Sequence, residues 1–258
     1  MVHVSVIGCG NMGSALVKGL SQTGRHTITA CDVDSEALAA VEPYCETTTT
    51  ELAVAAESPV VFVVLKPDLT ATIVEELELS DSQTLVSISA GVSTTTLEAR
   101  TDASVVRVMP NLAAATGDMA AAVAGAELTD DVVELLGDVG VFVEVDEAQM
   151  HISTAVNGSG PAFVFYLLNA MAQAGVAGGL DPADAEVLAA QTFKGAAETV
   201  LTSEKSIDEL IDDVCSPKGT TIEGMEVLRE STADEAVSDA VAAAERRSEE
   251  LARGTGDE

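Results

Sequence analysis

The glycine pattern Gly8-Cys9-Gly10-Asn11-Met12-Gly13 constrains the fold of this 258-residue chain more than any other feature of its sequence. A short apolar run predicts a strand over 3–7 before it, and apolar residues at helical spacing predict a helix over 14–21 after it. A second predicted strand, over 27–31, ends at Asp32, roughly twenty residues after the glycines. The alternative is a tight turn in an unrelated α/β protein. The flanking elements and the terminal acid favour a dinucleotide-binding unit, whose loop holds a pyrophosphate.

Three further apolar runs predict buried parallel strands over 60–65, 84–89 and 104–109. Their ends carry small, polar or proline residues, and ligands bind at this carboxyl edge of such sheets. Two more strands, over 119–123 and 141–145, flank a predicted helix over 130–139. Another helix is expected over 34–41, and the threonine runs at 47–50 and 94–96 are expected to be loops. We therefore predict a Rossmann-type dinucleotide-binding domain over residues 1–149.

Residues 150–258 are predicted to form an all-helical domain. Helical patterns cover 162–174, 182–202, 206–213 and 221–253, and the last has an expected break near 231–232. Their alanine-rich faces are too apolar for a small free-standing unit, which indicates burial against a partner subunit. The predicted fold class is therefore α/β, with a Rossmann-type domain followed by a helical dimerisation domain.

The segment from Asp213 to Gly224 is the second feature that indicates chemistry. Ser216-Pro217 ends the preceding helical pattern, and the pattern resumes after Thr221. Gly219, Thr220 and Thr221 are therefore expected to open a helix whose free backbone N–H groups bind a small anion, such as a carboxylate. The Thr221 hydroxyl adds a donor there, although threonine is also a common choice at the start of a helix.

The formal net charge of −31 is spread through the whole chain and excludes a basic face for nucleic acid or anionic membranes. Such self-repulsion destabilises a compact state in dilute buffer but is screened in molar salt, which favours a halophile cytosol. An ordinary acidic protein is the alternative. No apolar run reaches the length of a membrane span, and the N-terminus enters a strand with no leader-like segment. We expect a soluble, cytoplasmic protein.

The four cysteines have no close pair spacing, and the three histidines, His3, His26 and His151, stand apart from one another. No metal or redox signature results, so we expect reduced thiols, mostly buried, and no metal site.

Taken together, six motifs in order make the chain resemble pyrroline-5-carboxylate reductases. They are Gly8–Gly13, Leu-Lys-Pro at 65–67, Ser-Ala-Gly-Val at 89–92, Arg-Val-Met-Pro-Asn at 107–111, Asn-Gly-Ser-Gly-Pro-Ala-Phe at 157–163 and Ser-Pro-Lys-Gly-Thr-Thr at 216–221. The resemblance implies hydride transfer from a reduced nicotinamide to the C=N carbon of 1-pyrroline-5-carboxylate, which yields proline. It also implies a homodimer through the helical domain, commonly built into larger rings.

The resemblance also implies roles for individual residues. The catalytic candidate is Thr221, as hydrogen-bond donor to the imine nitrogen. The implied cofactor contacts are Gly8, Cys9, Gly10, Asn11, Met12, Gly13, Asp32, Val64, Leu65, Lys66, Pro67, Ser89, Ala90, Glu147 and Asp213. The implied substrate contacts are Glu204, Val214, Ser216, Gly219, Thr220 and Thr221. Exposed, solvated side chains are the alternative for Lys66 and Glu204.

Three departures from the family pattern involve four positions. Lys218 stands where the family has a second glycine, so we expect that the loop does not need a positive φ there or bends differently. Leu112-Ala113 replaces Thr-Pro, and Asn157 replaces a serine.

The cofactor is expected to be NADPH or NADH. Asp32 favours a ribose 2′-OH over a 2′-phosphate, and Glu51 stands where the family tends to carry asparagine near the ribose. Because molar salt would screen this repulsion, NADH is favoured only modestly.

Two other functions remain open. One is another enzyme of the same dehydrogenase architecture, either a reductase of a different cyclic imine or a β-hydroxyacid dehydrogenase. The β-hydroxyacid dehydrogenase would need a catalytic lysine on the helical domain, for which Lys194 is the candidate. A catalytically silent dinucleotide-binding module would not need the intact loop from Ser216 to Thr221.

Overall fold

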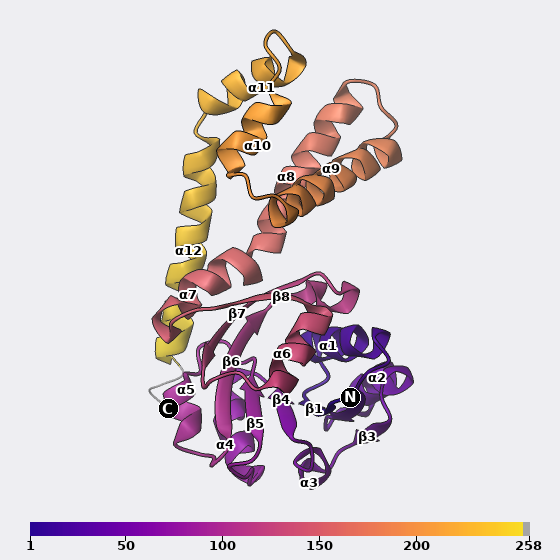
Figure 1. Ribbon diagram of the computed structural model, residues 1–258, viewed down its shortest axis with the longest axis vertical. Coiled ribbons are helices and arrows are strands. Elements are labelled where there is room, and N and C mark those ends of the chain that lie inside the picture. Colours follow the sequence, from indigo (N-terminus) through magenta and orange to yellow (C-terminus); the bar gives the residue numbers. More distant parts are fainter. Residues whose placement is uncertain (255–258) are drawn as a thin grey trace. The chain divides into compact units, whose positions relative to one another are not determined.

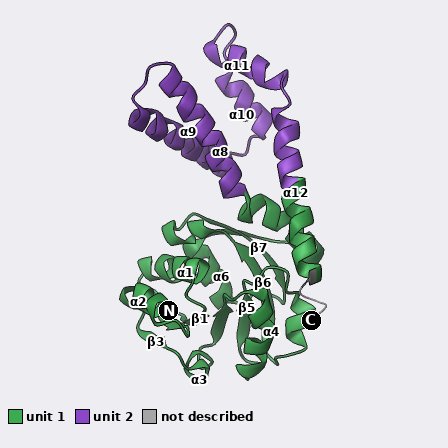
Figure 2. Cartoon of the chain, turned by 180° about the vertical axis from the view of Figure 1, so that it is seen from behind, with its two compact units in different colours: residues 1–159, 242–258 green, residues 160–241 purple. Residues whose placement is uncertain are grey.

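The computed structural model describes residues 1–254 and divides into two compact units (Figure 1). The sheet unit contains residues 1–159 and the described end of the chain, 242–254, and the helical unit contains Gly160–Val241 (Figure 2). The predicted border after residue 149 therefore lies inside the sheet unit. The end of the chain, expected in the helical domain, also belongs to the sheet unit.

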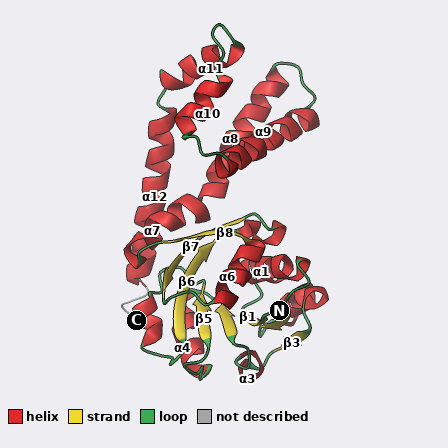
Figure 3. Cartoon of the chain, in the orientation of Figure 1, coloured by secondary structure: helices red, strands yellow, loops and turns green. Residues whose placement is uncertain are grey.

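The sheet unit is built on one eight-stranded sheet in the order β3-β2-β1-β4-β5-β6-β7-β8 (Figure 3). Every neighbouring pair is parallel except β6 and β7. The chain order reverses between β1 and β4, which makes the carboxyl ends of these two strands the expected ligand-binding crevice. The strands are β1 (His3–Ile7), β2 (Thr27–Cys31), β3 (Thr47–Thr49), β4 (Val60–Val63), β5 (Thr84–Ser87), β6 (Ser104–Pro110), β7 (Met119–Gly125) and β8 (Gly140–Glu144).

Helices cover both faces of this sheet because successive strand residues point to opposite faces. Phe62 packs with Leu16 of α1 and Leu136 of α6 in one core cluster, whereas Val61 joins Val74 of α4 in another. The helices of this unit are α1 (Asn11–Gln22), α2 (Ser35–Val41), α3 (Leu52–Ala55), α4 (Pro67–Glu76), α5 (Thr94–Glu98), α6 (Asp130–Val139) and α7 (Met150–Ser153). Short 3₁₀ turns at Glu42–Tyr44, Leu112–Thr116 and Glu147–Gln149 and a π-helical turn at Thr154–Gly158 complete it.

The prediction that both threonine runs form loops was wrong. Thr47–Thr49 form the edge strand β3, with Thr29 opposite Thr47, because β-branched residues fit a half-exposed strand. Thr94–Glu98 form helix α5, whose first turn is capped by the Ser93 side chain accepting from the Thr96 N–H. Helix α4 was also not predicted.

The helical unit contains α8 (Gly160–Ala177), α9 (Pro182–Thr202), α10 (Ile207–Val214), α11 (Thr220–Arg229) and the first part of α12 (Ala233–Gly254). Asp181 caps α9 through the Ala183 N–H, as predicted. Ser206 and Glu209 form a reciprocal capping box at the start of α10. The expected break near residues 231–232 is confirmed, since α11 and α12 are separate helices.

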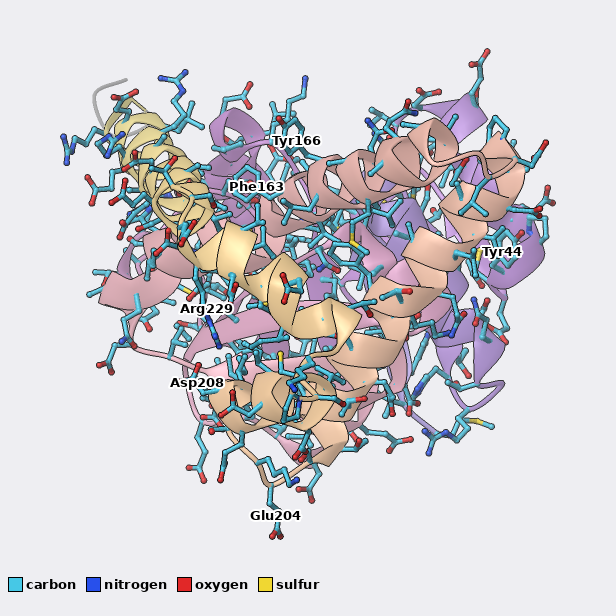
Figure 4. The ribbon with its side chains drawn as sticks, turned by 90° about the horizontal axis from the view of Figure 1, so that it is seen from above. Tyr44, Phe163, Tyr166, Glu204, Asp208 and Arg229 are labelled. Atoms are coloured by element: carbon cyan, nitrogen blue, oxygen red, sulfur yellow. The ribbon has the colours of Figure 1, made fainter. Side chains whose placement is uncertain are left out.

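The helices of this unit expose an unusual amount of apolar surface. Tyr166 is 76% exposed, Phe165 67% and Leu201 69%, and Figure 4 shows Tyr166 on the outside of α8. The expectation that no segment reaches the length of a membrane span was wrong for Glu147–Ala177, which could cross a membrane by length and composition alone. A single helix of this kind is weak evidence for a membrane span. Buried side chains between α8 and α9 are mostly alanines, such as Ala172 and Ala185. The exposed face is therefore large relative to the core that this unit builds by itself.

Candidate active site

The glycine loop lies tightly against its own helix and the neighbouring strand end. Gly8 has a φ of +96°, and a Cβ there would lie 2.3 Å from the carbonyl oxygen of Val64. A Cβ at Gly13 would lie 1.8 Å from the carbonyl oxygen of Gly8. Both positions therefore require glycine, because the backbone segments approach too closely to leave room for a Cβ.

The N-terminus of α1 fits a pyrophosphate. Its N-cap, Gly10, makes no side-chain capping bond, and its first turn carries no acid. A Cβ at Gly10 would meet no atom within 4 Å, so the space before the helix is open. The free N–H groups and the helix dipole of a twelve-residue helix favour an anion in that space. Within the loop, Asn11 is exposed and Met12 packs on the core.

Asp32 ties the end of β2 to the glycine loop. One carboxylate oxygen accepts the Cys9 N–H at 2.6 Å, and the other accepts the Asp34 N–H at 2.9 Å. Burial, reinforced by the Asp32 charge, raises the pKa of Cys9 to about 12 and that of Cys31 to about 11. The two thiols beside the loop are therefore neutral. The charge of exposed Glu51 also raises the Cys31 pKa, which places a second acid at this rim.

The family resemblance implies that Val64–Pro67, with Ser89 and Ala90, line the nicotinamide side of the cofactor, and this predicted nicotinamide wall follows β4. Lys66 is the exposed N-cap of α4, Pro67 is its first residue, and Val64 and Leu65 are half-buried. The buried Ser89 hydroxyl donates to the Leu65 carbonyl at 2.9 Å, which joins the ends of β4 and β5. Ala90, the next residue, is exposed.

A cleft of about 1440 Å³ within the sheet unit continues from this wall. Its lining includes Pro67, Gly91, Arg107 and Glu147, and the last turn of α12 packs against Gly91. Arg107 is only 3% exposed and pairs with Glu147 at 2.6 Å. The sequence analysis gave Glu147 as a cofactor contact and gave Arg107 no role. The pattern that could have identified Arg107 is a single cation inside an apolar strand, because a buried charge needs a partner.

Two asparagines fix the loop after β6. Asn111 accepts the Ala113 N–H and so caps the 3₁₀ turn in which Leu112-Ala113 replaces Thr-Pro. The Asn157 amide donates to the carbonyls of Met109 and Ala120 at 2.6 and 2.9 Å. A serine hydroxyl has one proton and could not make both bonds.

The predicted anion loop lies in the helical unit, where α11 begins at Thr220. Its N-cap, Gly219, makes no side-chain capping bond, and its N–H donates to the Ser216 carbonyl at 2.9 Å. Lys218 has a φ of +61°. Of the two expectations for Lys218, the one in which the loop needs no positive φ was therefore wrong, because the loop keeps the left-handed conformation that a glycine adopts without strain.

The other predicted residues of this region are all accessible. Val214, Ser216, Thr220 and Thr221 are exposed. Glu204 is exposed and points away from the helices in Figure 4. The Asp213 carboxylate pairs with Lys205 at 2.6 Å on the surface. All the substrate candidates therefore lie in the helical unit, and all the cofactor candidates other than Asp213 lie in the sheet unit.

One cluster in the described residues, His26, Glu134 and Asp138, has ligand atoms close enough to share a metal ion. The His26 Nε2 lies 2.6 Å from Asp138, which also contacts the Arg25 guanidinium. The buried Nδ1 of His26 has no partner, whereas metal-bound histidines donate the second nitrogen. The arrangement is that of an ion-pair cluster.

Comparisons with known proteins match both halves of the chain. A family model for pyrroline-5-carboxylate reductase dimerisation matches residues 147–251, and one for NADP oxidoreductase, coenzyme F420-dependent, matches residues 3–91. The pyrroline-5-carboxylate reductase of Methanosarcina acetivorans is 36% identical, over 97% of this chain and 98% of that protein. The chain belongs to the pyrroline-5-carboxylate reductase family.

Solved structures of reductases in this family have the same fold. The pyrroline-5-carboxylate reductase from Coxiella burnetii has a TM-score of 0.88 at 29% identity, covering 97% of this chain and 98% of that one. The Plasmodium falciparum pyrroline carboxylate reductase with NADP bound has a TM-score of 0.81 at 24% identity, with 97% and 98% covered. This second likeness concerns the fold alone.

Proposed function

We propose that the chain catalyses the NAD(P)H-dependent reduction of 1-pyrroline-5-carboxylate to L-proline, the last step of proline biosynthesis. The observation that carries this is the pair of uncapped helix N-termini at Gly10 and Gly219, in a chain that matches family members along nearly its full length. One suits a pyrophosphate and the other a small carboxylate. A dinucleotide and a small acid are the two ligands of this reaction.

The residues of the chain have separable roles in this reaction. The bound nicotinamide supplies the hydride, and the glycine loop holds the pyrophosphate. The N–H groups at Thr220 and Thr221, in the first turn of α11, hold the carboxylate, because no side chain caps this helix. The imine nitrogen gains electron density as the hydride arrives, and the Thr221 hydroxyl donates to it or orients its proton. A hydroxyl is a weak acid, so Thr221 acts by hydrogen bonding and alignment.

The substitution Thr221→Ala tests this assignment. Removing one donor to a developing charge typically lowers kcat about a hundredfold or more. We expect that loss for T221A, recovery for T221S, and little change in NADH or NADPH dissociation constants. Thr232→Ala, in the turn before α12, is the exposed control. Full turnover by T221A would remove Thr221 from the mechanism. No turnover by the folded, cofactor-binding wild type would refute the substrate.

We propose that NADH is used in preference to NADPH. Asp32 and Glu51 place two carboxylates at the rim where β2 and β3 end, and both repel a 2′-phosphate. Dissociation constants for both cofactors, measured for wild type and Asp32→Ser, test this. A lower NADH constant in the wild type and a gain of NADPH binding in D32S are expected. Tighter NADPH binding by the wild type at low salt would refute the preference.

We further propose a cytoplasmic homodimer or larger homo-oligomer from a halophile, with no nucleic-acid or membrane partner. The exposed apolar helices and the net charge of −31 support this. Turnover and Tm measured in KCl from about 0.1 to 3 M should both rise, because screening changes most across that range. A Tm that falls with salt would refute the halophile origin.

A further inference from the structure

Two buried hydroxyls lie directly behind the predicted nicotinamide wall. Thr70, on α4, is 0% exposed, and Ser89, beyond β5, is 1% exposed. Their oxygens are 2.5 Å apart. Ser89 also lies 2.9 Å from the Leu65 carbonyl, and Thr70 lies 3.0 Å from the Lys66 carbonyl. The pair therefore contacts two successive carbonyls at the point where the chain leaves β4.

The hydroxyl protons decide how this group is connected. Two hydroxyls carry two protons, but three contacts need one each. Two oxygens this close repel unless a proton lies between them, so one hydroxyl donates to the other. The Lys66 carbonyl already accepts the backbone N–H groups of Leu69 and Thr70. Neither carbonyl is left without a donor if the Thr70 hydroxyl donates to Ser89 and the Ser89 hydroxyl donates to the Leu65 carbonyl.

This chain of bonds sets the direction of the peptide between Leu65 and Lys66. The Leu65 side chain lies beside Gly8, since a Cβ on that glycine would be 2.9 Å from the leucine Cδ2. The peptide thus lies next to the glycine loop at the crossover between β1 and β4. Its polar backbone groups therefore lie at the crevice where sheets of this kind bind a dinucleotide.

We propose that Thr70 and Ser89 are positioning residues that orient the Leu65–Lys66 peptide for the nicotinamide half of the cofactor. The inference rests on the proposed use of a nicotinamide dinucleotide. It assigns Ser89 an indirect role, through Leu65, and adds Thr70, which no sequence motif indicates. The ADP half depends on the glycine loop, whose contacts do not involve either hydroxyl.

The test compares NADH with ADP-ribose, which has the same ADP half and no nicotinamide. Dissociation constants are measured by calorimetry, without substrate, for wild type, Ser89→Ala, Thr70→Val and Thr70→Ser. We expect NADH binding to weaken about tenfold in S89A, as for the loss of one buried hydrogen bond, and less in T70V. ADP-ribose binding should stay within about twofold of wild type, and T70S should match wild type for both ligands. Thr84→Val, buried at the opposite end of β5, is the matched control.

The outcomes separate this inference from the function on which it rests. Unchanged NADH binding in S89A overturns the positioning role and leaves the proposed reaction intact. Equal weakening of NADH and ADP-ribose binding overturns it too, because the hydroxyls would then only support the fold. A T70S variant that binds NADH as weakly as T70V also overturns it. A wild type that binds ADP-ribose but neither NADH nor NADPH overturns both proposals. Urea unfolding of every variant confirms that the compared proteins are folded.

Discussion

The sheet unit and the helical unit solve the problem of burying apolar side chains in opposite ways. Leu135 and Leu136 in α6 of the sheet unit are fully buried, and two core clusters lie on the two faces of one sheet. In the helical unit the cluster between α8 and α9 has only three buried alanines, while Leu201 is 69% exposed. One unit is stabilised by its own core, and the other exposes apolar side chains that the proposed homo-oligomer would bury.

The clearest way to break this comparison is to truncate one leucine in each unit. Leu136→Ala should cost about 2–5 kcal/mol of unfolding free energy, because it removes a fully buried side chain. Leu201→Ala should change the stability of the dissociated chain by at most about 0.5 kcal/mol. Urea unfolding at high and low protein concentration measures both. Equal costs at low concentration would show that the two units do not differ in this way.

A charge on the exposed face should act on assembly. Tyr166→Asp on α8 is expected to weaken self-association at least about tenfold, because a carboxylate would be desolvated at an apolar interface. Val133→Asp, on a valine of α6 that is 43% exposed in the sheet unit, is the control and should leave association unchanged. Analytical ultracentrifugation measures the dimer dissociation constants. Dissociation by V133D but not Y166D would move the interface to the sheet unit.

Alkaline pH should weaken the sheet unit through its thiols. Burial raises the pKa of Cys9 to about 12 and of Cys31 to about 11, from 9.0. The folded state keeps these protons where the unfolded state loses them, so stability holds below pH 9 and falls as the pH rises toward 12. The urea midpoint at pH 8 and pH 10 measures the loss, which Cys9→Ala should reduce. Cys215→Ala, in the helical unit, is the comparison variant, and an equal effect would contradict the assignment to Cys9.

The smallest effect is expected at the strained lysine of the helical unit. Lys218→Gly should stabilise the chain by up to about 1 kcal/mol, since glycine adopts positive φ without the steric cost but loses more entropy on folding. Lys218→Ala keeps the Cβ and should give no gain. Thermal unfolding of the two variants compares them directly. A gain in K218A equal to that in K218G would assign the effect to the charge.

The strands and the glycine loop could be predicted because their signals are local. Apolar runs and spaced glycines determine β1, β4 and α1 from neighbouring residues alone. The strand β3 could not be predicted in this way, because Thr47–Thr49 become a strand only by pairing with β2. Arg107 and Thr70 were missed for the same reason. Their partners, Glu147 and Ser89, are distant in sequence, and only the fold brings them together.

The path of the chain through the two units has a topological consequence. Residues 1–159 and 242–254 belong to one unit. The helical unit is therefore an insertion with two connections to the sheet unit, rather than a domain appended by one. Both of its ends are held by a body that folds around its own sheet, which limits the conformations that the inserted segment samples before it assembles. A circular permutant with new termini at the exposed turn between α9 and α10, around Glu204, would keep both attachments. Ending the chain before Ala242 would cut one of them.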